Sequence, residues 1–180
     1  MNLSAVQLCT AGAGDQILGR LIAENFAPDR LDVEVTETAL LSDFACARQN
    51  LATLSAAGVR IVLDDFGSGF ASVGYLREIC FDQIKLDGSL VTAAKDNPDG
   101  ERLLRGVIGL CQALGVMTVA EHIESEQQYA LLLRLGCNAG QGFWFQSPVC
   151  GGTSLFSSDV ASLLPEERGN RSSLLLAEGF

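Results

Sequence analysis

The chain has 180 residues, of which 48% are hydrophobic, and its formal net charge is −10. This length can bury one sizeable core, and no run of about 18 apolar residues is present that could span a bilayer as a helix. Only 12 Lys and Arg residues occur, which argues against DNA or RNA polymers as partners, because phosphate contacts depend on basic side chains. An anionic substrate would therefore need metal ions to offset the repulsion.

The chain alternates predicted helices and strands. Helices are indicated by apolar residues at helical spacing behind a capping residue, and strands by apolar runs or by alternation of apolar and polar residues. In chain order we expect a helix over 15–26, a strand over 31–37, a helix from 42 or 43 to 58, a strand over 59–63, a helical turn over 73–79, a strand over 81–86, a helix over 98–114, a strand over 116–120, a helix over 126–135, a strand-like segment over 137–145 and a short helix over 159–164. This alternation predicts parallel β/α units.

Six cysteines lie far apart without C-x-x-C spacing, and the sequence holds a single histidine. The cysteines are Cys9, Cys46, Cys80, Cys111, Cys137 and Cys150. This pattern favours reduced thiols and a cytoplasmic location over a disulfide framework or a zinc site.

Two adjacent carboxylates, Asp64 and Asp65, follow the apolar strand 59–63 and precede a glycine-broken loop, Phe66–Ser72. Two anions side by side repel each other unless a cation lies between them, which indicates a divalent-metal site with oxygen ligands. The alternative is that Asp64 caps a turn and Asp65 is solvated.

Polar residues recur at the carboxyl ends of the predicted strands, where a (β/α) barrel places its active site. They are Glu34, Asp64, Asp65, Lys85, Glu121 and Gln141. Each also has a local explanation, since Glu34 could face solvent and Glu121 could begin a helix. Lys85 could pair with Asp82 or Asp87.

Several segments resemble, in order and spacing, the motifs of the EAL-domain phosphodiesterases, which hydrolyse cyclic di-GMP. They are Glu34–Glu37, Asp64–Gly69, Lys85–Asp87, Ala120–Glu124 and Gln141–Phe143, and the opening Asn2–Ser4 is similar to an asparagine-bearing segment of the family. The resemblance covers about residues 1–149. It implies an α/β fold, a partial (β/α)8 barrel of the triosephosphate-isomerase type that lacks its first two to three strands and occupies residues 1–164. A loose carboxyl-terminal tail, 165–180, would follow.

The resemblance also implies a role for each matching residue, around a two-metal site that uses Mg²⁺ or Mn²⁺. The implied metal ligands are Asn2, Glu34, Asp64, Asp65 and Glu121. Catalytic roles fall on Asp65, Glu121 and Lys85, the lysine that holds or deprotonates the attacking water. The supporting residues would be Glu37, Asp87, Glu124 and Gln141. Glu37 would anchor the glycine loop, including Phe66, Gly67, Ser68 and Gly69, whose conformation couples metal binding to dimerisation in the family.

The chemistry agrees with these roles. Phosphodiester hydrolysis needs a nucleophile made from water and charge relief on the phosphoryl oxygens, and two cations about 3.5–4 Å apart supply both. The expected partners are cyclic di-GMP, a second copy of the chain, and sensory or regulatory domains in a longer parent protein.

The sequence departs from the family pattern at two places. The 180 residues contain no Glu-Ala-Leu tripeptide, so the signature glutamate, a metal ligand, and the nearby nucleotide-contacting arginine are not found. We therefore expect an open sheet edge beside residues 31–37, weakened metal binding and little phosphodiesterase activity from this chain alone. His122 replaces the usual glycine, and either adds a ligand, perturbs the site or is a partly exposed loop residue.

Three functions remain open. The chain could be a cyclic di-GMP phosphodiesterase domain seen as a fragment. It could instead be a catalytically inactive relative that binds cyclic di-GMP or a protein partner. A different metal-dependent barrel hydrolase could also converge on the pattern, although the ordered set of motifs argues against it.

Overall fold

The computed structural model describes residues 1–69, 73–145 and 175–176. Its strands form one sheet in sequence order, and every pairing between the described strands is parallel. The strands are β1 (Asp32–Thr36), β2 (Arg60–Phe66), β3 (Gln83–Leu86), β4 (Met117–Ala120), β5 (Ala139–Gly140) and β6 (Leu175–Leu176). This arrangement is a six-stranded arc of a (β/α) barrel. The sequence predicted a partial barrel, although it did not predict β6.

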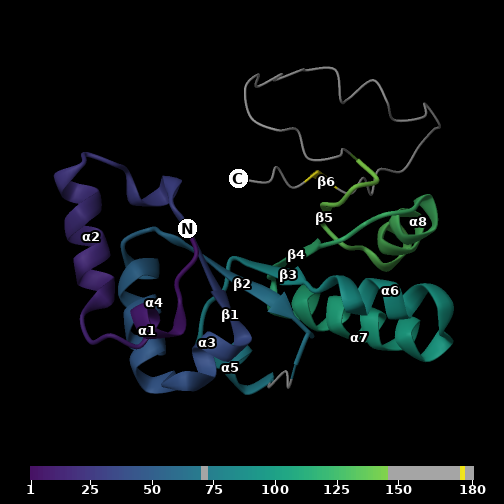
Figure 1. The fold of residues 1–180 in the computed structure, drawn as a ribbon, viewed down its shortest axis with the longest axis horizontal. Coiled ribbons are helices and arrows are strands. Elements are labelled where there is room, and N and C mark those ends of the chain that lie inside the picture. The colour runs from purple at the N-terminus through teal and green to yellow at the C-terminus, as the bar shows by residue number, and fades with distance from the viewer. Residues whose placement is uncertain (70–72, 146–174, 177–180) are drawn as a thin grey trace.

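The helices lie on the outside of this arc. Figure 1 shows the strands in the middle of the molecule, with the early helices around β1 and β2 and α6–α8 beside β3–β5. They are α1 (Ala5–Leu8), α2 (Ala13–Ala23), the 3-10 turn η1 (Pro28–Arg30), α3 (Glu37–Ser42), α4 (Phe44–Ala56), α5 (Val73–Glu78), α6 (Gly88–Asp96), α7 (Pro98–Leu114) and α8 (Glu126–Leu135). No helix within these described ranges is both long and apolar enough to cross a membrane.

Capping residues set the helix boundaries where the sequence placed them. Asp43 accepts a hydrogen bond from the Cys46 backbone amide at the start of α4, and Asn97 accepts one from the Asp99 amide before Pro98 opens α7. Gly115 ends α7 in the left-handed conformation, with φ of 71°. These local signals are why the predicted and observed helices agree to within a few residues.

The predicted strand over 137–145 is wrong over most of its length, because only Ala139–Gly140 pair with β4. Beyond β5 the backbone crosses the segment after β4: Gln141 accepts a hydrogen bond from the Ile123 amide, and the Trp144 amide donates to Ile123. Gly142, with φ of 154°, packs so closely that a Cβ atom would lie 2.2 Å from the Ile123 nitrogen. The chain therefore turns across the end of the sheet instead of extending it.

The edge beside β1 is also more covered than expected. The Leu3 amide donates to the Glu34 carbonyl at 2.9 Å, and the Glu34 amide donates to Met1 at 2.8 Å, so Asn2 forms a parallel bridge with Glu34. The first three residues thus occupy part of this edge. Helices α1, α3 and α6 were not predicted, and the predicted short helix at 159–164 lies outside the described residues. In the expected tail 165–180, the described residues are Leu175–Leu176, which form β6 beside β5.

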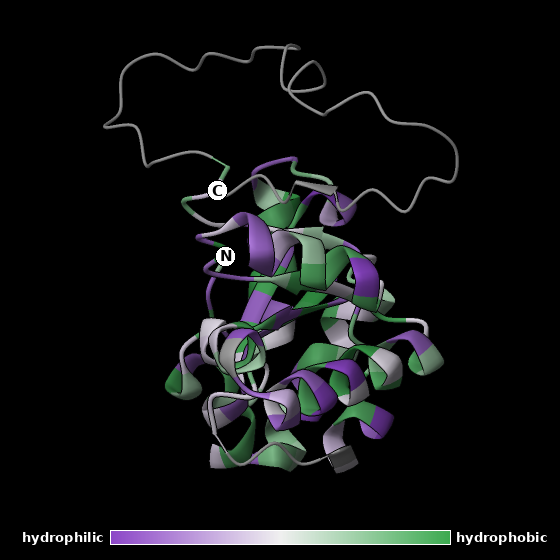
Figure 2. Ribbon diagram, turned by 90° about the vertical axis from the view of Figure 1, so that its right-hand side faces the viewer, coloured by the Kyte–Doolittle hydropathy of each residue, from purple (hydrophilic) through white to green (hydrophobic). Residues whose placement is uncertain are grey.

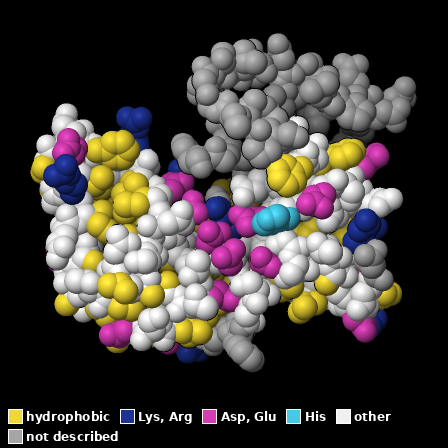
Figure 3. Space-filling view, in the orientation of Figure 1, with side chains coloured by type: hydrophobic (Ala, Val, Ile, Leu, Met, Phe, Trp, Pro, Cys, Tyr) yellow, Lys and Arg dark blue, Asp and Glu magenta, His cyan; other side chains and the backbone are white. Residues whose placement is uncertain are grey.

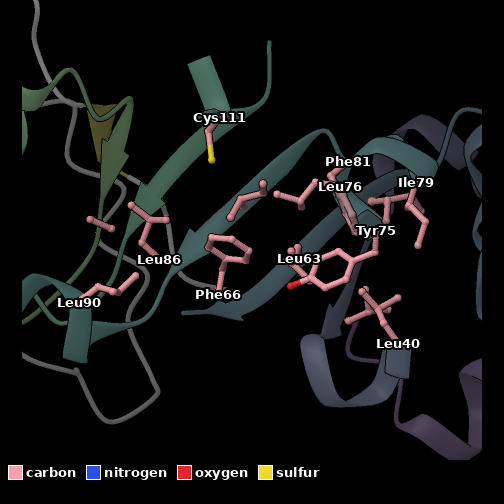
Figure 4. Packing of buried hydrophobic residues seen from close by; sticks show 14 of the residues in the cluster. Leu40, Leu63, Phe66, Tyr75, Leu76, Ile79, Phe81, Leu86, Leu90 and Cys111 are labelled. Carbon is pink, nitrogen blue, oxygen red and sulfur yellow. The ribbon is translucent and has the colours of Figure 1, made fainter. Parts of the chain in front are cut away.

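The core lies between the sheet and the helices. Figure 2 shows hydrophobic residues in the central strands and helices that carry both hydrophobic and hydrophilic residues. Figure 4 shows Leu63 and Phe66 of β2 among the buried side chains of the core, with Tyr75 beside Leu63. Burial of these side chains fixes β2, and hence the positions of the two aspartates near its end.

Candidate active site

The site residues lie at the carboxyl ends of β1–β5, and strand alternation decides which way each one points. In β1, Val33 and Val35 are buried against the helices while Glu34 between them is half-buried on the other face. In β3, Lys85 lies in the same way between the buried Ile84 and Leu86. Successive strand side chains point to opposite faces, so Glu34 and Lys85 both project to the inner face of the arc.

A break in the regular strand lets two neighbouring aspartates reach one place. The pairing of β2 with β3 shifts register between Leu63 and Phe66, and Asp65 has a left-handed backbone with φ of 56°. In a regular strand Asp64 and Asp65 would face opposite sides, whereas this bulge re-aims one of them. Oxygens of Asp64, Asp65 and Glu121 all lie within 4.8 Å of one another.

Lys85 lies among the carboxylates. Its Nζ atom donates to Glu34 Oε2 at 2.7 Å and is 3.7 Å from both Asp64 Oδ1 and Glu121 Oε1. The predicted alternative pairs do not form: Asp82 accepts from the Ile61 amide, and Asp87 caps α6 by accepting from the Ser89 amide. Figure 3 shows acidic side chains gathered around a basic one in the middle of this face.

The charges in this cluster are only partly balanced. Burial, together with the negative charges of Asp65 and Glu34, raises the pKa of Asp64 despite the opposing effect of Lys85. Burial and the nearby aspartates raise the pKa of Glu121. The pKa of Lys85 is also raised: burial opposes this shift, but the hydrogen bond to Glu34 and the charges of Asp64, Glu34 and Glu121 outweigh it. The single ammonium group of Lys85 therefore does not neutralise the carboxylates around it.

This unbalanced set fits divalent cations. Carboxylate oxygens that converge from several strands are the ligands that Mg²⁺ and Mn²⁺ prefer. Raised carboxylate pKa values show that the metal-free fold disfavours the ionised forms, and a bound cation would reverse that preference. Asp64, Asp65 and Glu121 are the residues most directly placed to hold such ions.

Gln141 and His122 flank Glu121 in different ways. Gln141 Nε2 donates to Glu121 Oε1 at 2.7 Å, which orients this carboxylate. His122 is exposed and has a left-handed backbone with φ of 55°, a conformation that favours glycine. Its side chain packs over Gly88, where a Cβ atom would lie 2.6 Å from His122 Cβ. Figure 3 shows the single histidine, in cyan, next to acidic side chains.

Glu37 begins α3 directly after β1 and is 4% exposed. The Tyr75 hydroxyl of α5 donates to its Oε1 atom, and a Cβ atom on Gly69 would lie 3.9 Å from its Oε2 atom. Glu37 thus lies next to the described part of the glycine loop, Phe66–Gly69. Sequence reasoning missed Tyr75, and an aromatic residue placed one turn into the helix after this loop was the available signal.

Three predicted residues, Asn2, Glu124 and Asp87, take more peripheral positions. Asn2 lines, together with Glu34, a cavity of about 440 Å³ that continues along the first turns of α1 and α3. Glu124 is exposed, and its backbone amide donates to Gln128. Asp87 caps α6, as described above, so its contact is with a helix and not with the carboxylate cluster.

The fold is a partial (β/α) barrel whose acidic cluster could hold divalent cations, and comparison with known proteins identifies its family. The EAL domain model matches residues 1–148. The chain is 36% identical over 148 residues to the cyclic di-GMP phosphodiesterase RocR of Pseudomonas aeruginosa, covering 82% of this chain and 38% of RocR. This chain belongs to the EAL domain family.

Two solved structures extend the comparison. The phosphodiesterase MucR of Pseudomonas aeruginosa, in complex with cyclic di-GMP, matches with a TM-score of 0.74 and 35% identity over 82% of this chain and 60% of that one. BlrP1 of Klebsiella pneumoniae, with manganese and cyclic di-GMP, matches with a TM-score of 0.71 and 31% identity over 79% of this chain and 36% of that one. The chain spans less than two-fifths of the length of RocR and about a fifth of MucR.

Proposed function

We propose that this chain is a phosphodiesterase domain that binds two divalent cations, Mg²⁺ or Mn²⁺, and hydrolyses cyclic di-GMP to the linear dinucleotide. The observation that carries the proposal is the convergence of Glu34, Asp64, Glu121 and Lys85 from four neighbouring strands at one end of the sheet. MucR and BlrP1, which share this fold and are solved with cyclic di-GMP, support the choice of substrate.

Each residue has a defined task in this reaction. Asp64, Asp65, Glu121, Glu34 and the Asn2 side chain would hold the cations, which when bound supply a water of lowered pKa and neutralise charge on the phosphoryl oxygens. In the reaction one water is consumed, a bond from its oxygen to phosphorus forms, and one ester bond from phosphorus to a ribose oxygen breaks.

The main task of Lys85 and Gln141 would be to position other groups at the site. Lys85 presents an ammonium group among the carboxylates, where it can donate a hydrogen bond to the attacking water and so orient it. Gln141 holds the Glu121 carboxylate in place through its hydrogen bond, so this carboxylate would lose little freedom when a cation binds. Glu37 would anchor the glycine loop through its neighbours Tyr75 and Gly69.

A second candidate is a catalytically inactive domain that binds cyclic di-GMP or a protein partner. The absence of a Glu-Ala-Leu tripeptide from the 180 residues favours it, because the family's signature metal ligand is then not supplied by this sequence. In either case we expect the domain to work in the cytoplasm as a homodimer or beside sensory and regulatory domains.

Binding and turnover separate the two candidates. We expect the purified chain to bind cyclic di-GMP in the presence of Ca²⁺, followed by calorimetry, and to release linear dinucleotide slowly with Mn²⁺, followed by chromatography. Asp64→Asn should abolish the product, whereas Asp29→Asn, which removes an exposed charge in η1 before the start of β1, should not. Binding without product would favour the inactive module, and neither binding nor product would refute both.

A further inference from the structure

Two cysteines that are 37 positions apart in sequence meet beside the amino-terminal segment. Cys9 follows α1 and Cys46 lies in the first turn of α4, and both are partly exposed. The Cys46 thiol donates to the Cys9 carbonyl oxygen at 3.1 Å. The Cys9 thiol in turn points to the start of α4, 3.8 Å from the Asp43 carbonyl.

The geometry brings both sulfur atoms to the same turn of backbone. Helical side chains lean back over the preceding turn, so Cys46 covers the region of Asp43, where the Cys9 sulfur also lies. From standard backbone dimensions, Cys46 Sγ is at most about 6 Å from the Cys9 Cα atom. Rotation of two short side chains can close such a gap to the separation that a disulfide requires.

Buried hydrogen bonds hold the two segments in this relation. Asn50, which is 5% exposed, donates through Nδ2 to the carbonyls of Leu8 and Thr10 on either side of Cys9, both at 2.8 Å. Its Oδ1 atom accepts from the Gly14 amide at 3.2 Å. The hydrogen bonds of Asn50, which lies one helical turn after Cys46, thus hold the backbone around Cys9 beside α4.

We propose that Cys9 and Cys46 form a redox modification site, a reversible disulfide that ties the amino-terminal segment to α4. With glutathione disulfide as oxidant, one cysteine thiolate attacks it, forming a mixed disulfide and releasing one glutathione thiol. The second cysteine then displaces the other glutathione. Two thiol hydrogens leave the protein, two electrons pass to glutathione disulfide, and a thiol reductant reverses both steps.

The bond would act on a part of the chain that reaches the candidate active site. Residues Met1–Leu3 pair with Glu34, and Asn2 lines the cavity that Glu34 shares. Tying Cys9 to α4 removes freedom from this segment in the unfolded and partly opened states. Oxidation therefore holds Asn2 beside β1 without placing any new group in the site.

Peptide mapping tests the proposal on the full chain. After incubation of the native protein with glutathione disulfide, remaining thiols are alkylated under denaturing conditions and the protein is cut with trypsin. Cys9 falls in peptide 1–20 and Cys46 in peptide 31–48, so the bond appears as one linked species that a reductant separates. We also expect the midpoint of thermal unfolding to rise by about 5–10 °C on oxidation.

Matched variants complete the test. Cys46→Ser should abolish the linked species and the thermal shift, whereas Cys80→Ser, which removes an exposed cysteine, should preserve both. Cys111 is an internal control, because burial raises the pKa of its thiol to about 11 and should leave it unoxidised. Full alkylation of Cys9 and Cys46, or stable glutathione adducts without the linked species, would overturn the proposal. If the disulfide-linked protein has a midpoint of thermal unfolding no higher than that of oxidised Cys46→Ser, the proposed stabilisation of the amino-terminal segment would be overturned.

Discussion

Replacing Asp64 with Asn should make the metal-free protein more stable while removing its response to metal. Oxygens of Asp64, Asp65 and Glu121 lie within 4.8 Å of one another, so each pair of charges repels by about 1–3 kcal/mol for an effective dielectric constant between 20 and 80. Lys85, 3.7 Å away, offsets part of this repulsion. The raised pKa of Asp64 shows that the balance disfavours its charge. We expect a net gain of about 1 kcal/mol, or roughly 2–4 °C in the unfolding midpoint.

The effect of metal should run in the opposite direction. A cation that binds only the folded state stabilises the wild-type protein by about 2.7 kcal/mol at one hundred times its dissociation constant. For a chain of this size, that corresponds to a rise of roughly 5–10 °C. Asp64→Asn lacks one anionic ligand oxygen in the centre of the cluster, so its rise should be close to zero.

Thermal unfolding by circular dichroism, with EDTA or with saturating Mn²⁺, measures both effects in one experiment. Asp29→Asn makes the same change of charge at an exposed position of η1 and should behave as wild type in both conditions. The reasoning fails if Asp64→Asn melts below wild type in EDTA. It fails equally if the variant keeps the full stabilisation by Mn²⁺.

Three further predictions concern the same site. Lys85→Met should lower the metal-free free energy of unfolding by about 2–3 kcal/mol in urea titrations, because the carboxylates lose the ammonium group that partly neutralises them. Mg²⁺ should restore part of this loss, and an unchanged urea midpoint would contradict the prediction. Because the pKa values of Asp64 and Glu121 are raised, the folded state binds more protons than the unfolded state. The contribution of these two groups to the metal-free free energy of unfolding should therefore fall as pH rises from about 4 to 7. Asp64→Asn should flatten this dependence of stability on pH. Gly142→Ala should destabilise the fold by about 2 kcal/mol or more, since its Cβ atom would clash with the Ile123 backbone; a neutral effect in urea would rule out this tight crossing.

Most of the strands, and the face of β1 on which Glu34 lies, could be predicted because both follow from local patterns. Alternation in residues 31–37 placed Glu34 on the face opposite Val33 and Val35, which the structure confirms. A lysine between apolar residues in the strand over 81–86 required a partner. Its nearest partner, Glu34, is 51 positions away, so only the parallel arrangement of the strands could indicate it.

Other features depend on tertiary contacts that no local pattern encodes. The left-handed backbones of Asp65 and His122 occur at non-glycine residues, so composition gave no sign of the bulge or of the turn after β4. The segment 137–145 has a strand-like sequence, but its backbone pairs with the loop around Ile123 once β4 has ended. Helix α6 depends on its cap, Asp87, which sequence reasoning had assigned to the site.

The charge of the site connects its stability with its chemistry. Four carboxylates, those of Glu34, Asp64, Asp65 and Glu121, surround or adjoin one ammonium group, so the metal-free cluster remains negative. Such a cluster would repel cyclic di-GMP, the substrate proposed above, and the overall charge of −10 would add to the repulsion at low ionic strength. Divalent cations would remove both obstacles at once, since they neutralise the carboxylates and present positive charge to the phosphates. Substrate binding should therefore depend on metal even where no bond is broken.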